Sequence, residues 1–315
     1  MAAAAPLPLT EQPAAADRLR RRATYAAVAV AALLIALKFA GWLATGSVAL
    51  LSSLLDSLLD IAASLVNLVA VRHAMSPADR EHRFGHGKAE PLAVLGQSAF
   101  IIGSAMLLFA EAIRRLIWPV PVENPPAGIA VMIFSIAVTV GLVLYQRHVV
   151  RRTGSIAVSA DELHYRSDVV LNFGVIFALV LGSALEQPLL DPLFGAAIGV
   201  WIVYSAVRLV RLSLFQLMDH ELDDDEREKI RGIAQSHPDV AAAHDLRTRV
   251  AGPTAFIQIH IEMDGSLSLV RAHEISDEVE AKLRAAYPNA EIMIHQDPEG
   301  IEEPRANFPR RVAMR

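Results

Sequence analysis

The feature that most limits the fold is an apolar run at residues 47–71, which is long enough to cross a bilayer but contains Asp56 and Asp60. A charged side chain at the centre of a membrane helix costs roughly 2.5–3.5 kcal/mol, so two carboxylates in one segment require a cation or protons. Residues four positions apart lie on the same side of an α-helix. The sequence therefore predicts a membrane helix with one polar face.

A second segment of this kind begins further along the chain, at ELHYRSD, where His164 and Asp168 are again four residues apart. If the two polar faces meet, three carboxylates and one imidazole form an oxygen and nitrogen cage of the kind that zinc prefers. A polar helix contact or a proton relay without metal remains the alternative. The predicted metal site consists of Asp56, Asp60, His164 and Asp168.

The composition places membrane and soluble parts in series along one chain. Hydrophobic residues make up 53% of the 315 residues, yet charged residues cluster between the apolar runs and after residue 218. The net charge of -5 gives no indication of nucleic-acid binding. The chain has no cysteine, which excludes disulfides and thiolate ligands.

Six apolar runs predict an α-helical membrane bundle with both termini on one side of the membrane. Lys and Arg collect at the N-terminus and in alternate loops, so the positive-inside rule predicts cytoplasmic termini. We expect a disordered N-terminal arm at 1–17 and a six-helix transmembrane domain at 18–219. The six predicted spans are 24–44, 47–71, 91–118, 129–145, 163–185 and 192–218.

The segment after Met218 predicts a small cytoplasmic domain at 220–300, followed by a flexible tail at 301–315. In TAFIQIHIEM, Ile257, Ile259 and Ile261 alternate with polar residues, which is typical of a half-buried strand. The element order α-β-β-α-β predicts an α+β, metallochaperone-like fold with helices on one face of the sheet.

Two further groups of residues have ligand spacing. Between the second and third spans, Asp79, His82 and His86 fall within eight positions and predict a second, more exposed metal site. In the C-terminal domain His295 and Asp297 face the same way on one strand, and His260 alternates out of the apolar face of another. An ordinary polar sheet face is the alternative there. Four other histidines are predicted to be solvated or interfacial: His73, His148, His220 and His237.

The motifs LLDSLLD, PADREHRFGHGKAE, ELHYRSD, HDLRTR, FIQIHIEM and IMIHQDP together resemble the cation diffusion facilitator family, in particular its bacterial zinc and ferrous-iron efflux branch. The resemblance covers nearly all of the chain from about residue 18 to residue 298. It implies a homodimer in the bacterial inner membrane, with Asp56, Asp60, His164 and Asp168 as the transport site. It also implies a cytoplasmic binuclear site formed by His244, His260, His273, His295 and Asp297.

The function expected from this resemblance is efflux of a divalent cation, with zinc, ferrous iron and cadmium as candidate ions. Because metal ligands must lose protons to bind, we expect exchange for protons by alternating access, regulated by metal at the cytoplasmic domain. An enzyme is not expected, since the chain lacks H-E-x-x-H and four protein ligands leave no position for catalytic water. A membrane-anchored metal sensor without transport is the alternative.

Overall fold

The computed structural model of the chain describes residues 13–45, 48–117, 126–185 and 190–301. Along parts of the helices, including position 56, only the backbone is described. The chain divides after Met218 into two compact units. Each unit is presented separately.

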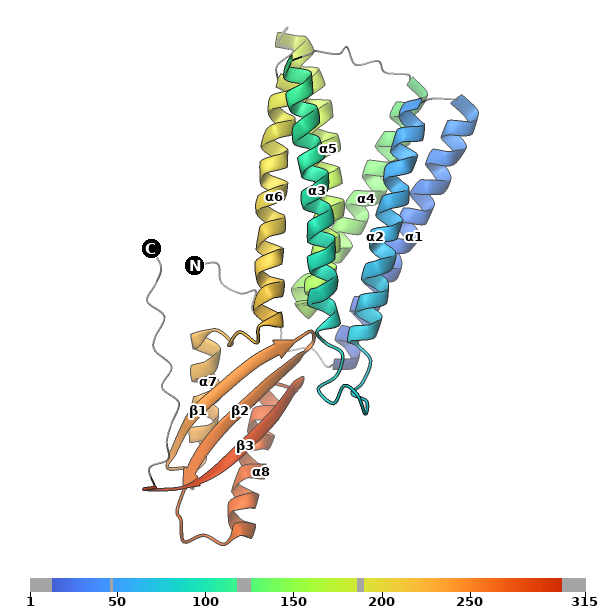
Figure 1. The fold of residues 1–315 in the computed structure, drawn as a ribbon. Coiled ribbons are helices and arrows are strands. Elements are labelled where there is room, and N and C mark those ends of the chain that lie inside the picture. Colours follow the sequence, from blue (N-terminus) through green and yellow to red (C-terminus); the bar gives the residue numbers. More distant parts are fainter. Residues whose placement is uncertain (1–12, 46–47, 118–125, 186–189, 302–315) are drawn as a thin grey trace. The chain divides into compact units, whose positions relative to one another are not determined.

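The first unit consists of six long helices, which confirms the predicted helical membrane architecture (Figure 1). Each helix is long and continuous because its apolar run is rich in Leu, Ala and Val. Short connections join most of the helices. Their bounds are α1 Pro13–Thr45, α2 Val48–Ala74, α3 Ala89–Ile117, α4 Pro126–Thr153, α5 Ile156–Leu185 and α6 Leu190–Leu217.

The start of α1 differs from the sequence prediction. The helix begins at Pro13, so residues 13–17 of the predicted disordered arm are helical. Proline is favoured at the first position of a helix, and the three alanines that follow are strong helix formers. Residues 1–12 of that arm, and all but the first residue of the predicted tail at 301–315, lie outside the described residues.

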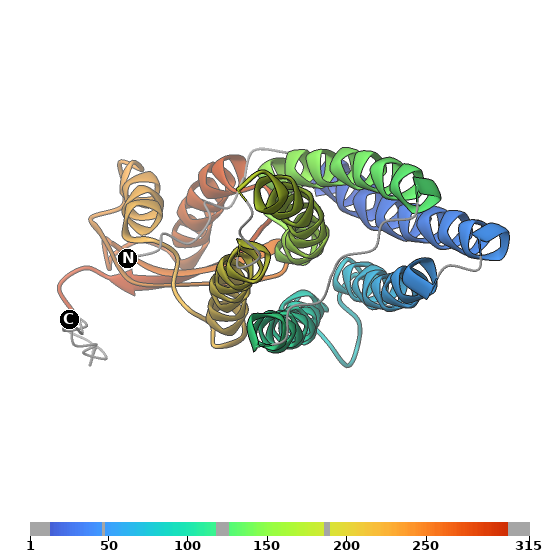
Figure 2. The ribbon, with the colours of Figure 1, turned by 90° about the horizontal axis from the view of Figure 1, so that it is seen from above.

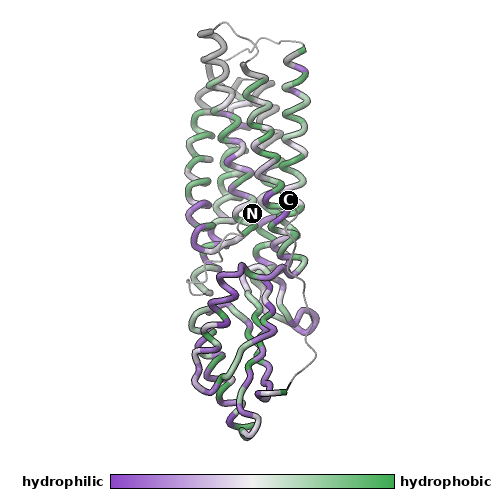
Figure 3. Tube along the Cα trace, turned by 90° about the vertical axis from the view of Figure 1, so that its left-hand side faces the viewer, coloured by the Kyte–Doolittle hydropathy of each residue, from purple (hydrophilic) through white to green (hydrophobic). Residues whose placement is uncertain are grey.

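Within the described part of the chain, five helices are long and apolar enough to span a membrane: α1, α2, α3, α4 and α6. The remaining long helix, α5, carries the charged segment 161–168 in its first half, and most side chains in its second half lie outside the description. Figure 3 shows hydrophobic residues along most of the helical unit, whereas hydrophilic and hydrophobic residues alternate in the C-terminal unit.

Helix α5 is central to the packing of the bundle, because it contacts each of the other five helices. Figure 2 shows the bundle along the helix axes. Val71, Ile101, Leu163 and Ile202 belong to one buried cluster that joins α2, α3, α5 and α6. The polar faces predicted on α2 and α5 therefore belong to helices that touch.

The second unit has the predicted order α7 Asp224–Gln235, β1 Ala242–Ala251, β2 Thr254–Met263, α8 Leu269–Ala286 and β3 Ala290–Pro298. The sheet order is β1-β2-β3, and β2 and β3 are parallel. Both helices lie on one face of the sheet (Figures 1 and 2). Ile257, Ile259 and Ile261 are fully buried and Gln258 is exposed, so the predicted alternation is confirmed.

Candidate metal sites

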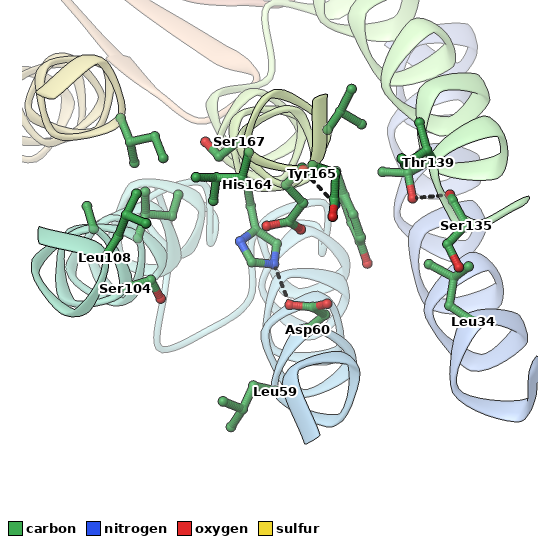
Figure 4. Close-up of a pocket in the computed structure, with 18 of the residues that line it drawn as sticks. Leu34, Leu59, Asp60, Ser104, Leu108, Ser135, Thr139, His164, Tyr165 and Ser167 are labelled. Carbon is green, nitrogen blue, oxygen red and sulfur yellow. Dashed lines mark hydrogen bonds and ion pairs between the residues drawn. The ribbon is translucent and has the colours of Figure 1, made fainter. Parts of the chain in front are cut away.

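The helical unit contains a cavity of about 350 Å³ whose lining includes residues from all six helices (Figure 4). Within it Asp60 on α2 faces His164 on α5, with 3.0 Å between Oδ1 and Nε2. Ligand atoms of Asp60, His164 and Asp168 all lie within 4.8 Å of one another. We call these three residues the cavity cluster.

The cavity cluster is the meeting of polar faces that the sequence predicts. His164 is only 7% exposed, and Asp60 and Asp168 are half-buried. Two carboxylate groups and one imidazole at this spacing suit a borderline divalent cation such as zinc. The fourth predicted ligand, Asp56, lies on α2 one turn before Asp60, but its side chain is outside the described residues.

A buried polar network next to the cavity cluster was not predicted. Asp161, which is 1% exposed, accepts hydrogen bonds from Gln97 Nε2 at 3.3 Å, Gln146 Nε2 at 2.6 Å and Ser64 Oγ at 3.3 Å. Ser64 Oγ also lies 2.8 Å from the hydroxyl of Tyr165. We call these five residues the Asp161 network. It joins α2, α3, α4 and α5.

The Asp161 network fixes the register in which α2 meets α5. Ser64 lies one turn after Asp60, and Asp161 lies one turn before His164. The contact between Ser64 and Asp161 therefore places Asp60 opposite His164. Helical spacing is the sequence signal that could have indicated Asp161, because a residue three positions before His164 lies on the same side of the helix.

The loop between α2 and α3 brings together the three ligands predicted for a second metal site, Asp79, His82 and His86. His86 Nε2 lies 3.3 Å from Asp79 Oδ2, and His82 Nδ1 lies 3.5 Å from Asp79 Oδ1. Gly85 adopts a φ of 75°, a conformation that costs glycine little and lets the loop close on itself. We call these three ligands the loop cluster.

Backbone groups hold the Asp79 carboxylate in place. The N–H groups of His82 and Glu81 donate to Oδ1 at 2.7 and 2.9 Å, and these bonds keep the pKa of Asp79 below its usual range. The carboxylate is thus charged and ready to bind a cation at neutral pH. His73, predicted to be solvated or interfacial, is exposed, and its ring lies edge-on to that of His86 with 4.5 Å between ring centroids.

The open face of the C-terminal sheet carries a third group around Asp297, which is 4% exposed. Asp297 Oδ2 lies 2.9 Å from His260 Nδ1 and 3.1 Å from His244 Nε2. Asp297 Oδ1 lies 3.1 Å from His295 Nε2, yet it is buried and accepts no hydrogen bond from the described residues. We call His244, His260 and Asp297 the sheet cluster, with His295 beside it.

A bulge in β1 explains how His244 reaches the sheet cluster. Ala243 and Leu246 are both buried, so the two residues between them break the alternation of the strand. Asp245 has a φ of 42°, a conformation that aspartate tolerates better than most residues. Its carboxylate lies 3.8 Å from His260 Nε2. The sequence does not indicate Asp245 as a candidate ligand, because regular alternation along β1 would point its side chain into the core.

One predicted member of the cytoplasmic site does not join it within this chain. His273 lies on α8, is 70% exposed, and has Nε2 3.6 Å from Asp277 Oδ2. Glu262, which was not predicted, does join the group, with Oε1 3.1 Å from His244 Nδ1.

His237, predicted to be solvated or interfacial, is buried. Its Nδ1 accepts from the Asp239 N–H, so Nε2 donates to Glu278 at 2.9 Å. This bond is the main reason that the pKa of Glu278 lies below its usual range. His237 therefore has a structural role in the C-terminal unit.

Comparison with known proteins identifies the family of both units. Residues 24–218 match the cation efflux transmembrane domain, and residues 222–299 match the cation efflux protein cytoplasmic domain. The chain belongs to the cation diffusion facilitator, or cation efflux, family. The family resemblance of the six motifs is thereby confirmed.

Curated members of the cation efflux family are similar to almost the whole chain. The cation-efflux pump FieF of Escherichia fergusonii is 51% identical over 281 residues, which cover 89% of this chain and 93% of the relative. FieF of Cronobacter sakazakii is 50% identical over 282 residues, with the same coverage. Among solved structures, the metal-bound C-terminal domain of the CzcD transporter from Thermotoga maritima is 30% identical, with a TM-score of 0.24, and covers 25% of this chain and 93% of that one.

Proposed function

We propose that this protein exports divalent metal cations, and that the cavity cluster is its transport site. The observation that carries the proposal is the convergence of Asp60, His164 and Asp168 in a cavity lined by all six helices. Carboxylates and an imidazole within a membrane bundle mark an ion pathway, because their cost in lipid is offset only by a bound cation or by protons. The similarity to cation-efflux pumps over 89% of the chain supports this function.

The chemistry of the ligands supports coupling to protons. A divalent cation binds a neutral imidazole and charged carboxylates, so its arrival displaces protons from His164, Asp60 and Asp168, and protons from the opposite side displace the cation. Alternating access of one cavity then exchanges metal for protons. The sequence shows no Gly-rich phosphate loop, which agrees with an ion gradient as the energy source.

The mixed oxygen and nitrogen ligands favour zinc, with ferrous iron and cadmium as further substrates, because borderline cations accept both ligand types. The positive loops support an orientation in the bacterial inner membrane with both termini in the cytoplasm. In that orientation the sheet cluster and the loop cluster sample cytoplasmic metal.

We assign a regulatory role to the C-terminal unit. A metal ion bound at the sheet cluster shifts the carrier between states only as far as its affinity differs between them. The match to the cytoplasmic domain of cation efflux proteins supports a homodimer formed through this unit.

Zinc flux into inverted membrane vesicles with an imposed pH gradient tests the proposed function. Asp60→Ala should reduce uptake to the level of empty vesicles, because it removes the carboxylate that faces His164. Glu111→Gln, which neutralises an exposed carboxylate that pairs with Arg114, is the matched control and should transport normally. Normal uptake by Asp60→Ala would rule out the cavity cluster as the transport site.

The same measurement distinguishes a carrier from a membrane-anchored sensor. A sensor would bind zinc at its C-terminal unit and give no flux in any vesicle. The buried cavity cluster supports the carrier, since a sensor has no need of metal ligands inside the membrane bundle.

A further inference from the structure

Lys38 is a charged side chain whose place in the helical unit the proposed function does not explain. It is the one charged residue in segment 24–45 of α1. A lysine within a membrane helix is as costly as an aspartate, so its presence calls for a specific partner. The structure places Lys38 in the lining of the same cavity that contains the cavity cluster.

Neighbouring residues on α1 and α2 show where the ammonium group of Lys38 lies. Leu34, one turn earlier on α1, is buried and lies on the cavity wall (Figure 4). Lys38 Nζ donates to Ser57 Oγ at 2.7 Å. Ser57 is 1% exposed and lies one turn before Asp60 on α2, so the ammonium is held on the helix that supplies Asp60.

Lys38 lines the same cavity as the carboxylates of the cavity cluster and brings a fixed positive charge to it. Among the described residues of the lining, Asp60 and Asp168 are the carboxylates, His164 is the imidazole and Lys38 is the ammonium group. Asp161, a buried carboxylate close to the cavity cluster in sequence, is not among the residues that line the cavity and accepts hydrogen bonds from three neutral donors.

We propose that Lys38 is the fixed countercharge of the transport site and sets how tightly the metal is held. This inference rests on the proposed efflux function. Its ammonium group repels a divalent cation in the same cavity and so weakens metal binding. A carrier must bind its ion tightly enough to capture it and weakly enough to release it. Lys38 therefore favours release of the metal.

The test uses three substitutions in the full chain. Lys38→Gln removes the charge but keeps a hydrogen-bond donor for Ser57, Lys38→Met removes both, and Lys38→Arg keeps both. Zinc flux in proteoliposomes gives the half-saturating zinc concentration and the maximal rate. Zinc binding to the purified protein, minus the binding that remains in His164→Ala, gives the affinity of the cavity itself.

We expect Lys38→Gln and Lys38→Met to lower the half-saturating zinc concentration about tenfold or more, because one full repulsion is removed in a medium of low effective dielectric constant. The maximal rate should fall in parallel as release slows. Lys38→Arg should remain close to the wild type. Tighter binding is the deciding sign, since damage to the packing would weaken binding.

Two results would overturn the proposal that Lys38 is a countercharge. One is unchanged or weaker binding in Lys38→Gln, and the other is equal tightening in Lys38→Arg. If Lys38→Met does not fold, Lys38→Gln decides alone, because it preserves the bond to Ser57. These outcomes are distinct from failure of the proposed function, in which the wild type itself would give no zinc flux.

Discussion

At the scale of single residues, His164 is the member of the cavity cluster that we expect to decide between metal ions. It contributes the one nitrogen ligand of the cavity cluster, and its Nε2 lies 3.0 Å from Asp60 Oδ1. Nitrogen ligands suit zinc, whereas sites made only of oxygen suit harder ions such as manganese.

His164→Asp should therefore shift transport from zinc towards manganese. Replacing the imidazole with a carboxylate makes the cavity an all-oxygen site, and we expect the ratio of zinc to manganese flux to fall about tenfold, which corresponds to about 1.4 kcal/mol. Metal-resolved flux in proteoliposomes measures this ratio. His164→Ala is the control and should transport neither ion. An unchanged ratio in His164→Asp would show that ligand type does not determine selectivity.

The sequence predicted the cavity cluster because helical spacing and the cost of charge in lipid both act on neighbouring residues. Asp60, His164 and Asp168 could be recognised from two short motifs and the rule that residues four apart share a face. Asp245 could not, since its position depends on a bulge in β1 that breaks the alternation. Asp161 was missed because its partners come from three other helices, and sequence spacing does not show which helices touch.

At the scale of secondary-structure elements, the Asp161 network holds four helices in one register. A buried carboxylate with three donors stabilises the bundle only while all its partners remain satisfied. Removing the acceptor leaves Gln97, Gln146 and Ser64 with fewer partners, at a cost of about 1–3 kcal/mol for each group left without one.

Asp161→Ala should consequently lower the thermal unfolding temperature of the detergent-purified protein and reduce zinc flux together. Flux depends on the network because the contact between Ser64 and Asp161 sets Asp60 opposite His164. Thr24→Val is the matched control, since the buried Thr24 hydroxyl donates to the Arg21 carbonyl of its own helix and Thr24 is not among the residues that line the cavity. An Asp161→Ala protein with normal stability and flux would show that the network does not set the register.

At the scale of the whole molecule, the chain combines two compact units, each with its own buried residues and its own candidate metal ligands. The sequence predicted this division from the change in composition after Met218. It also predicted the order of elements in the second unit, because strand alternation and helix signals are local. His273 was grouped with Asp297 only because the family resemblance implied it. Within one chain, His273 lies beside Asp277.

This division predicts that metal removal and mutation of the sheet cluster act on the C-terminal unit without destroying the transport site. Zinc that binds only the folded state stabilises it by about 2.7 kcal/mol at a hundred times its dissociation constant. Addition of zinc to chelator-treated wild type should therefore raise the unfolding temperature of the C-terminal unit. The near-ultraviolet signal of Tyr287, a fully buried residue of that unit, follows this transition.

Asp297→Ala should abolish most of that zinc-dependent rise, because Asp297 contacts His244, His260 and His295 together. His295→Ala should retain most of it, since the sheet cluster keeps its three ligands. His164→Ala should retain it fully while losing flux, which separates the two units in one experiment. A zinc-dependent rise that survives in Asp297→Ala would place the stabilising ion elsewhere, and the regulatory role assigned to the sheet cluster would fail with it.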